Sequence, residues 1–202
     1  MTAEEVEAFA ACVAAGGVGL FPADTVYGLA TSPDHEAGVR RLYEIKGRAA
    51  DRPAAVMFFA LEHVLETLGH LGARTREAIG RLLPGPLTVV LPNPGRLYPL
   101  ACGPAPHRLG VRVPALTGAL EPLGAVRTPV LQSSANRTGG PDARRLADVE
   151  GSVRAAADVE LDAGELPGTP STVLDLASYE DDGRYEVLRE GAVPAARLAA
   201  EL

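Results

Sequence analysis

Two cations separated by one glycine, Lys46 and Arg48, are the first residues in this sequence whose spacing could serve a chemical purpose. In an extended segment, side chains two residues apart lie on one face, so both charges would reach the same ligand. Gly47 and the downstream Pro53 favour an extended segment. Such a pair suits phosphate oxygens, which arginine grips in a fork and lysine binds as a point charge. The alternative is a solvated helix C-terminus, where cations offset the helix dipole.

A second polar pair, Ser134 and Asn136, follows the apolar residues Val130 and Leu131. The apolar residues are typical of the end of a buried strand, and the glycines and proline that follow predict a loop. Open α/β sheets place their ligands just beyond the carboxyl ends of strands, which indicates a binding role for this pair. The alternative is turn chemistry, in which both side chains bond their own backbone.

Taken together, these segments resemble the YrdC family of threonylcarbamoyl-AMP synthases. The family's fingerprint is a Thr-Val-Tyr-Gly-Leu turn, a Lys-x-Arg pair and a Ser-x-Asn loop, in that order along the chain. The corresponding segments here are Thr25–Leu29, Lys46–Arg48 and Ser134–Asn136, and further matches are Pro84–Thr88, Val111–Pro114, Ser171–Asp175 and Leu188–Gly191. The resemblance covers nearly the whole chain and implies one YrdC-like domain over residues 1–202, without the C-terminal domain of the longer synthases.

The resemblance implies an enzyme, a nucleotidyltransferase that condenses L-threonine, bicarbonate and ATP to threonylcarbamoyl-AMP and pyrophosphate. Magnesium would arrive with the ATP, without protein metal ligands, and separate transferase proteins would use the product to modify tRNA. Direct contact with tRNA stays open. One alternative is a non-catalytic YrdC-like paralogue that binds RNA or a nucleotide. Another is a carbamoyl-phosphate-dependent carbamoyltransferase, although such domains usually belong to much longer chains.

The resemblance also implies roles for individual residues, with Lys46 and Arg48 as the catalytic pair. Threonine would contact three hydroxyl residues and one arginine, namely Thr25, Ser134, Ser171 and Arg112. The expected ATP-binding residues are Lys46, Arg48, Arg52, Arg108, Asn136, Arg144 and Arg189. Simpler roles are open for some of them: Thr25 could cap a turn, Ser171 could end a strand, and Arg112 could cover apolar surface. Met57 stands where the family often has His, which leaves the amino-acid selectivity open.

Composition narrows the class of ligand and the compartment. The net charge of −7 over 202 residues disfavours a long nucleic acid, whereas cations gathered around the motifs suit a small polyanion such as ATP. Aromatic residues make up only 4%, so a platform for stacked bases is not expected. Cys12 and Cys102 are far apart and form no metal-binding pattern, which indicates a reducing cytoplasm. The sequence contains no apolar run long enough for a membrane span.

The elements that must position these residues alternate between strands and helices, which predicts one α/β domain with a twisted, mixed parallel and antiparallel sheet flanked by helices. Thr2 and Glu5 form the pattern of a capping box. Asp34 is expected to cap a helix that runs to about residue 45. Residues 61–83 predict two short helices, and residues 143–157 predict a helix interrupted near its middle by glycine. The Gly/Pro-rich segment 164–170 is expected to form a flexible cover over the site.

Overall fold

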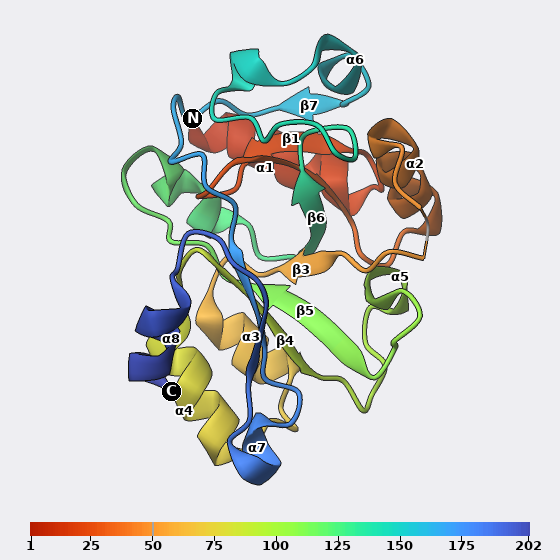
Figure 1. Cartoon of the computed structure of the whole chain (residues 1–202). Helices are drawn as coiled ribbons and strands as arrows, with labels where there is room; N and C mark the ends of the chain where they lie inside the picture. The colour runs from red at the N-terminus through yellow and green to blue at the C-terminus, as the bar shows by residue number, and fades with distance from the viewer. Residues whose placement is uncertain (50) are drawn as a thin grey trace.

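A mixed sheet runs through the whole molecule (Figure 1). The computed structural model describes residues 1–49 and 51–202, and within them nine strands hydrogen-bond in the order β7-β1-β2-β6-β3-β5-β4-β8-β9. Three neighbouring pairs are parallel, namely β7 with β1, β3 with β5, and β4 with β8, and the others are antiparallel. The strands are β1 Gly19–Pro22, β2 Tyr27–Thr31, β3 Ala55–Met57, β4 Leu87–Pro92, β5 Arg108–Arg112, β6 Val130–Ser134, β7 Val159–Glu160, β8 Thr172–Asp175 and β9 Glu186–Arg189. The prediction of a mixed α/β sheet is therefore confirmed.

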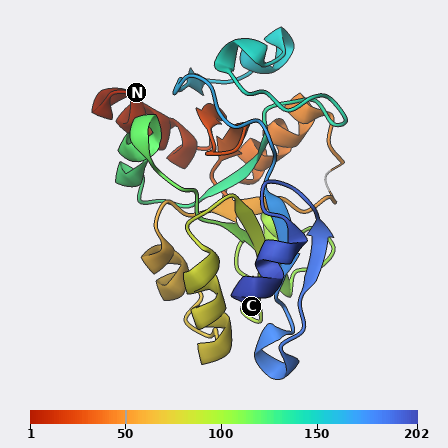
Figure 2. The ribbon, with the colours of Figure 1, turned by 60° about the vertical axis from the view of Figure 1, so that its left-hand side comes forward.

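Helices pack around this sheet, and in Figure 2 α3 and α4 lie together on one side of its lower half, with α8 beside α4. The α-helices are α1 Ala3–Ala14, α2 Glu36–Lys46, α3 Leu61–Thr67, α4 Ala73–Leu82, α5 Pro99–Cys102, α6 Gly151–Arg154, α7 Tyr179–Asp182 and α8 Ala195–Glu201. Two 3₁₀ segments, η1 Gly118–Ala125 and η2 Leu146–Asp148, complete the described elements. The capping box at Thr2 and the division of residues 61–83 into two helices are confirmed. In the part of the chain that the structure describes, none of the helices combines the length and apolar character needed to span a bilayer.

Two predicted helix features are wrong. The N-cap of α2 is His35, whose Nδ1 accepts a hydrogen bond from the Gly38 amide at 3.1 Å, so Asp34 lies one residue before the cap. The helix predicted over residues 143–157 is reduced to η2 and the single turn of α6. The reason is tertiary: the carbonyls of Ala143 and Arg144 accept hydrogen bonds from Tyr27 and Leu166, so this backbone bonds neighbouring segments instead of a helical turn.

The Lys46-Gly47-Arg48 segment is not extended, so that prediction is wrong. The alternative of a helix C-terminus holds for the backbone, although Lys46 is buried and not solvated. Lys46 is the last residue of α2, and Gly47 ends the helix in the left-handed region at φ 57°. The Arg48 amide then donates to the Tyr43 carbonyl at 2.9 Å, which closes the last turn. The two cations consequently leave the backbone in different directions and enter different environments.

The sheet presents a core to one side and a cavity to the other, because successive side chains on a strand point to opposite faces. The core-facing residues of the central strands are completely buried, and they are Leu29, Val56, Val89, Val111, Leu131 and Leu174. Their neighbours on the opposite face include Gly28 and Gly110, which have no side chain, and Ala55, which has only a methyl group, so room is left above the sheet. One face of the sheet is therefore covered by large core residues, and the small residues on the other face leave a hollow.

Helix α1 is fixed to the sheet by Phe9, which is fully buried and stacks on Phe21 of β1 with ring centroids 5.3 Å apart. We expect Phe9→Ala to lower the free energy of unfolding by about 3–5 kcal/mol, since it removes a buried ring and leaves a cavity. Glu7→Ala is the matched control, because Glu7 is exposed on the same helix and should change stability by less than about 0.5 kcal/mol. Urea unfolding followed by circular dichroism compares the two, and equal stabilities would contradict this role of Phe9.

Candidate functional site

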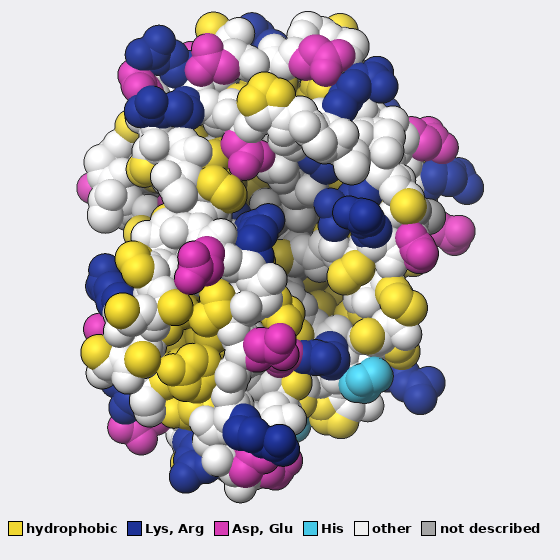
Figure 3. All heavy atoms as spheres, viewed as in Figure 1, with side chains coloured by type: hydrophobic (Ala, Val, Ile, Leu, Met, Phe, Trp, Pro, Cys, Tyr) yellow, Lys and Arg dark blue, Asp and Glu magenta, His cyan; other side chains and the backbone are white. Residues whose placement is uncertain are grey.

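A cavity of about 400 Å³ lies on the open face of the sheet. Figure 3 shows this face hollowed near its centre, with Lys and Arg side chains on both sides of the hollow. Its walls come from β2, β3, β4, β5, β6, β8 and β9, together with the turn after β1 and the segment after α2. Polar residues gather at several points of this wall, and the remainder is mainly small and apolar.

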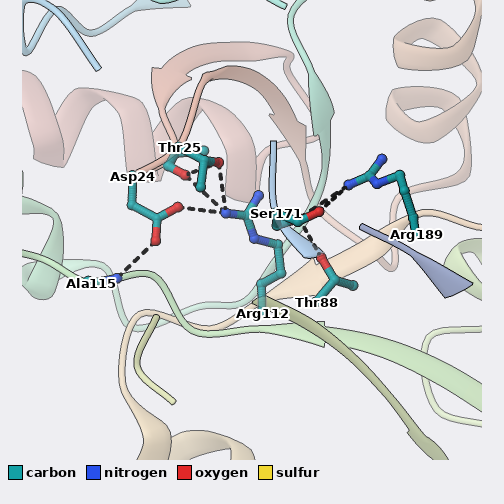
Figure 4. A network of polar contacts seen from close by, with 8 residues as sticks. Asp24, Thr25, Thr88, Arg112, Ala115, Ser171 and Arg189 are labelled. Carbon is teal, nitrogen blue, oxygen red and sulfur yellow. Dashed lines mark hydrogen bonds and ion pairs between the residues drawn. The ribbon is translucent and has the colours of Figure 1, made fainter. Parts of the chain in front are cut away.

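Arg112, near the centre of Figure 4, is the most deeply buried cation of the cavity wall. Its Nη2 donates to Asp24 Oδ1 at 2.6 Å, to the Ala23 carbonyl at 3.1 Å and to Thr25 Oγ1 at 3.2 Å. Within the described residues, its Nε is buried and has no hydrogen-bond partner. A buried, partly unpaired guanidinium beside a cavity is suited to an anionic group of a ligand, such as a carboxylate.

Asp24 holds this arginine in place. It has a left-handed backbone with φ 58°, which is uncommon for a residue with a side chain. Its second carboxylate oxygen accepts a hydrogen bond from the Ala115 amide at 3.1 Å. Burial raises the pKa of Asp24, although the Arg112 charge opposes the shift. Burial likewise lowers the pKa of Arg112, with Asp24 acting in the opposite direction. The two groups are therefore desolvated together, and each compensates the charge of the other.

Ser171 connects Arg112's side of the cavity with the edge of the sheet (Figure 4). Its hydroxyl lies 3.0 Å from Thr88 Oγ1, and Arg189 Nη2 donates to its carbonyl at 2.7 Å. Arg189 belongs to the edge strand β9 and is exposed. A hydroxyl and a second, exposed cation thus lie at the same wall.

Two further arginines border the cavity. Arg48 packs over the Tyr43 ring with its guanidinium carbon 5.8 Å from the centroid, and Nη2 donates to the Pro53 carbonyl. Burial lowers the pKa of Arg48, but the group remains a cation at neutral pH. Arg108 forms an ion pair with Asp175, which lies on β8. The cavity therefore collects positive charge in a protein whose net charge is −7.

Lys46 lies outside the cavity wall and is only 2% exposed. Its ammonium donates to the carbonyls of Ser134 and Asn136, the latter at 2.7 Å, and to Asn136 Oδ1 at 3.1 Å. Asn136 Oδ1 also accepts from Ser134 Oγ at 2.7 Å, and Asn136 Nδ2 donates to the Gly140 carbonyl at 2.6 Å. Lys46 and the loop after β6 consequently form one hydrogen-bonded unit.

The structure brings many of the residues singled out in the sequence to one cavity. Those on its wall are Thr25, Arg48, Arg108, Arg112, Ser134, Ser171 and Arg189. It leaves four others off the described wall, namely Lys46, Arg52, Asn136 and Arg144. Arg52 is exposed, and Arg144 forms an ion pair with Glu165 at 2.7 Å. Any role of these four in binding ATP stays a prediction.

Sequence reasoning missed the supporting residues Asp24, Thr88 and Asp175. The position of Asp24 directly before the Thr25–Leu29 motif was the available signal for its role. Thr88 and Asp175 lie inside recognised motifs, but nothing in their spacing shows which cavity residue each contacts. Met57 is completely buried and pairs with Arg112 across β3 and β5. Across the described chain, His, Cys, Asp and Glu form no group of three that could hold a metal ion.

The segment 164–170, predicted to be a flexible cover, is an extended strap with fixed attachments. The Leu166 amide donates to the Arg144 carbonyl at 2.8 Å, and the Gly168 amide donates to the Thr25 carbonyl at 2.9 Å. The buried Tyr27 hydroxyl donates to Asp162 Oδ1 at 2.7 Å just before the strap begins. Pro170 reaches the cavity wall. Moving this strap would break these bonds, so the structure shows an anchored segment that meets the cavity wall at Pro170.

An open-faced α/β sheet with a buried arginine and further cations around one cavity defines a protein that binds small anionic ligands. Comparison with known proteins gives the family. The Sua5/YciO/YrdC family model, described as "Telomere recombination", matches residues 11–191. The chain therefore belongs to the Sua5/YciO/YrdC family.

Individual relatives agree with this assignment. The threonylcarbamoyl-AMP synthase of Chromohalobacter salexigens is 33% identical over 89% of this chain and 96% of its own length. The protein of the same name from Pyrococcus abyssi is 31% identical over 86% of this chain, which spans half of that relative's length. The crystal structure of P. abyssi Sua5 complexed with L-threonine matches all of this chain and 58% of its own, with 28% identity and a TM-score of 0.87.

The environment of Lys46 generates a pH prediction. Burial and the neighbouring Arg48 lower the pKa of Lys46 from 10.5 to about 8, while Asp142 opposes the shift. Because the unfolded chain keeps this proton up to about pH 10.4, unfolding takes up a proton above about pH 8. The contribution of Lys46 to the free energy of unfolding therefore rises with pH in this window.

We expect the free energy of unfolding of the wild type, relative to Lys46→Met, to increase between about pH 8 and pH 10. Urea unfolding of both proteins at a series of pH values measures the difference, and subtraction removes the groups that they share. A difference that is constant over this range would mean that folding leaves the pKa of Lys46 unchanged.

Proposed function

We propose that this protein is an L-threonylcarbamoyladenylate synthase, which condenses L-threonine, bicarbonate and ATP to threonylcarbamoyl-AMP and pyrophosphate. The observation that carries the proposal is one cavity that combines the buried Arg112, flanked by hydroxyls, with the more exposed Arg48, Arg108 and Arg189. The amino acid needs the buried arginine with its hydroxyls, and the nucleoside triphosphate needs the more exposed arginines. The two environments must adjoin, because the two substrates react with each other. The names of the relatives and the L-threonine complex of P. abyssi Sua5 support the same reaction.

The hydroxyl-rich part of the cavity binds threonine in this proposal. Arg112 pairs with the carboxylate, because a desolvated guanidinium with an unused N–H gains most from an anionic partner. Thr25, Ser134 and Ser171 supply hydrogen bonds to the polar groups of the substrate. The apolar residue Met57 lies buried beside Arg112 and offers no hydrogen-bond donor at that position.

The arginine-rich part binds the triphosphate. Arg48 and Arg189 hold phosphate oxygens and stabilise the charge that develops on the leaving pyrophosphate. Arg108 binds the nucleotide either after its ion pair with Asp175 breaks or while that ion pair remains in place. Magnesium accompanies ATP, because it prefers oxygen ligands and phosphate oxygens supply them. Arg52, Asn136 and Arg144 lie farther from the cavity and contact ATP only after side-chain movement.

The chemistry needs positioning and positive charge more than a protein nucleophile. Bicarbonate loses hydroxide to give CO₂, and the amine nitrogen of threonine bonds to the CO₂ carbon. The proton that the amine releases combines with the hydroxide to form water, which leaves the carbamate. A carbamate oxygen then attacks the α-phosphorus of ATP as the bond to the β-phosphate bridging oxygen breaks, and pyrophosphate leaves. The product is a labile mixed anhydride, so the anchored strap over the site protects it from water.

Further steps belong to other proteins. We place the protein in the cytoplasm, where separate transferase proteins take up the adenylate and modify tRNA. The acidic net charge gives little general attraction for a nucleic acid. The competing function, a non-catalytic paralogue that binds RNA or a nucleotide, requires none of the threonine-binding hydroxyls.

Threonine-dependent release of pyrophosphate tests the proposal. Purified protein with ATP, magnesium and bicarbonate should release pyrophosphate when L-threonine is added and much less with the other common amino acids. The same series answers the question of selectivity that Met57 raises. Binding of ATP without pyrophosphate release, with every amino acid tested, would establish the non-catalytic alternative instead.

Arg48→Ala should lower the rate of pyrophosphate release at least ~100-fold while the far-ultraviolet circular dichroism stays unchanged, because lost charge stabilisation of a transition state typically costs several kcal/mol. Arg127→Ala is the matched control, since Arg127 is an exposed arginine that is absent from the cavity wall. Near-normal turnover of Arg48→Ala would remove Arg48 from the triphosphate site.

A further inference from the structure

The buried ammonium of Lys46 makes its three side-chain hydrogen bonds to one loop. A lysine ammonium has three N–H donors, and lysine is almost never fully buried unless it is paired. Here the donors reach the carbonyls of Ser134 and Asn136 and the Oδ1 of Asn136. The hydrogen-bonding capacity of Lys46 is thus used inside the protein.

The same loop is bonded to Lys46 through the backbone as well. The Thr138 amide donates to the Lys46 carbonyl at 2.8 Å, so the end of α2 contacts the loop at both its start and its middle. The loop is further tied to β2, because the Ala135 amide donates to the Tyr27 carbonyl at 2.8 Å. Ser134, the last residue of β6 and the one from which the loop begins, reaches the cavity wall.

Lys46 and Arg48 therefore differ in what they can do for a bound ligand. Arg48 borders the cavity, whereas Lys46 lies behind the loop and is 2% exposed. To reach a phosphate, the ammonium would have to give up its hydrogen bonds to three oxygens. Of these, Asn136 Oδ1 would keep the hydrogen bond from Ser134 Oγ, and the two carbonyls would lose a charged donor. Asn136 is in the same situation, because its amide bonds Lys46, Ser134, Gly140 and Asp142.

We propose that Lys46 is a positioning residue for threonine: its ammonium folds the Ser134–Thr138 loop so that the Ser134 hydroxyl faces the cavity. The identity of the ligand rests on the proposed function. The two cations of the Lys-x-Arg pair then have separate roles. Arg48 binds the triphosphate, and Lys46 sets the shape of the threonine pocket.

The experiment compares Lys46→Met, which keeps an unbranched side chain one atom shorter and has no donor, with Arg48→Met as the matched variant. Titration calorimetry measures threonine without nucleotide, then AMP and ATP separately. Hydrogen–deuterium exchange measures the amides of residues 133–142 without any ligand. Circular dichroism verifies that each variant is folded.

We expect Lys46→Met to weaken threonine binding at least ~10-fold in the absence of nucleotide and to speed exchange in residues 133–142, since charge-assisted bonds to the loop are lost. Arg48→Met should weaken ATP more than AMP and leave threonine binding and loop exchange unchanged. If Lys46→Met instead weakens only ATP and keeps the loop protected, Lys46 is a phosphate ligand and the inference is wrong.

Asn136→Ala provides a second, milder variant if Lys46→Met does not fold, since it removes one of the three acceptors and leaves the lysine paired. It should also weaken threonine binding and speed loop exchange, whereas an effect on ATP alone would contradict the inference. Failure of the wild-type protein to bind threonine would contradict the proposed function. The exchange measurements would still decide the role of Lys46 in the loop.

Discussion

The buried ion pair between Arg112 and Asp24 is the interaction on which the site depends. Their side chains are 4% and 6% exposed, and 88 residues separate them in the sequence. A charge buried without its partner costs several kcal/mol, so neither residue can leave the pair at a low cost. The pair joins β5 to the turn after β1, and through Ala115 it also fixes the segment that follows β5. The end of the cavity beside Arg112 is thus held by three parts of the chain.

The sheet supplies the space around this pair. Large aliphatic residues fill the face toward the helices, while Gly28, Ala55 and Gly110 occupy the other face. Because a strand alternates its side chains between the two faces, one sequence pattern builds both the core and the cavity. Strands therefore supply Arg108, Arg112 and Ser134 of the cavity wall, and strands hold polar groups more rigidly than loops do.

Ion pairing, and not the overall composition, decides which arginines keep a positive charge available to a ligand. Arg112, Arg108 and Arg144 each have an acidic partner, at Asp24, Asp175 and Glu165 respectively. In this reading Arg48 and Arg189 are the cations most available to a polyanion, and Lys46 is a structural cation inside the fold. An acidic protein can thus present a cationic cavity without attracting long nucleic acids to its surface.

The sequence by itself determined the family, the mixed α/β sheet and seven of the polar residues that line the cavity, because motifs and hydrophobic periodicity are local properties of the chain. It also determined the capping box at Thr2, where donor and acceptor are three residues apart. Only the tertiary structure decided that Lys46 turns inward, that Asp24 pairs with Arg112, and that residues 143–144 bond neighbouring segments instead of forming a helix. Each of these outcomes depends on a partner many residues away, and spacing along the chain carries no information about which distant groups meet when the sheet closes.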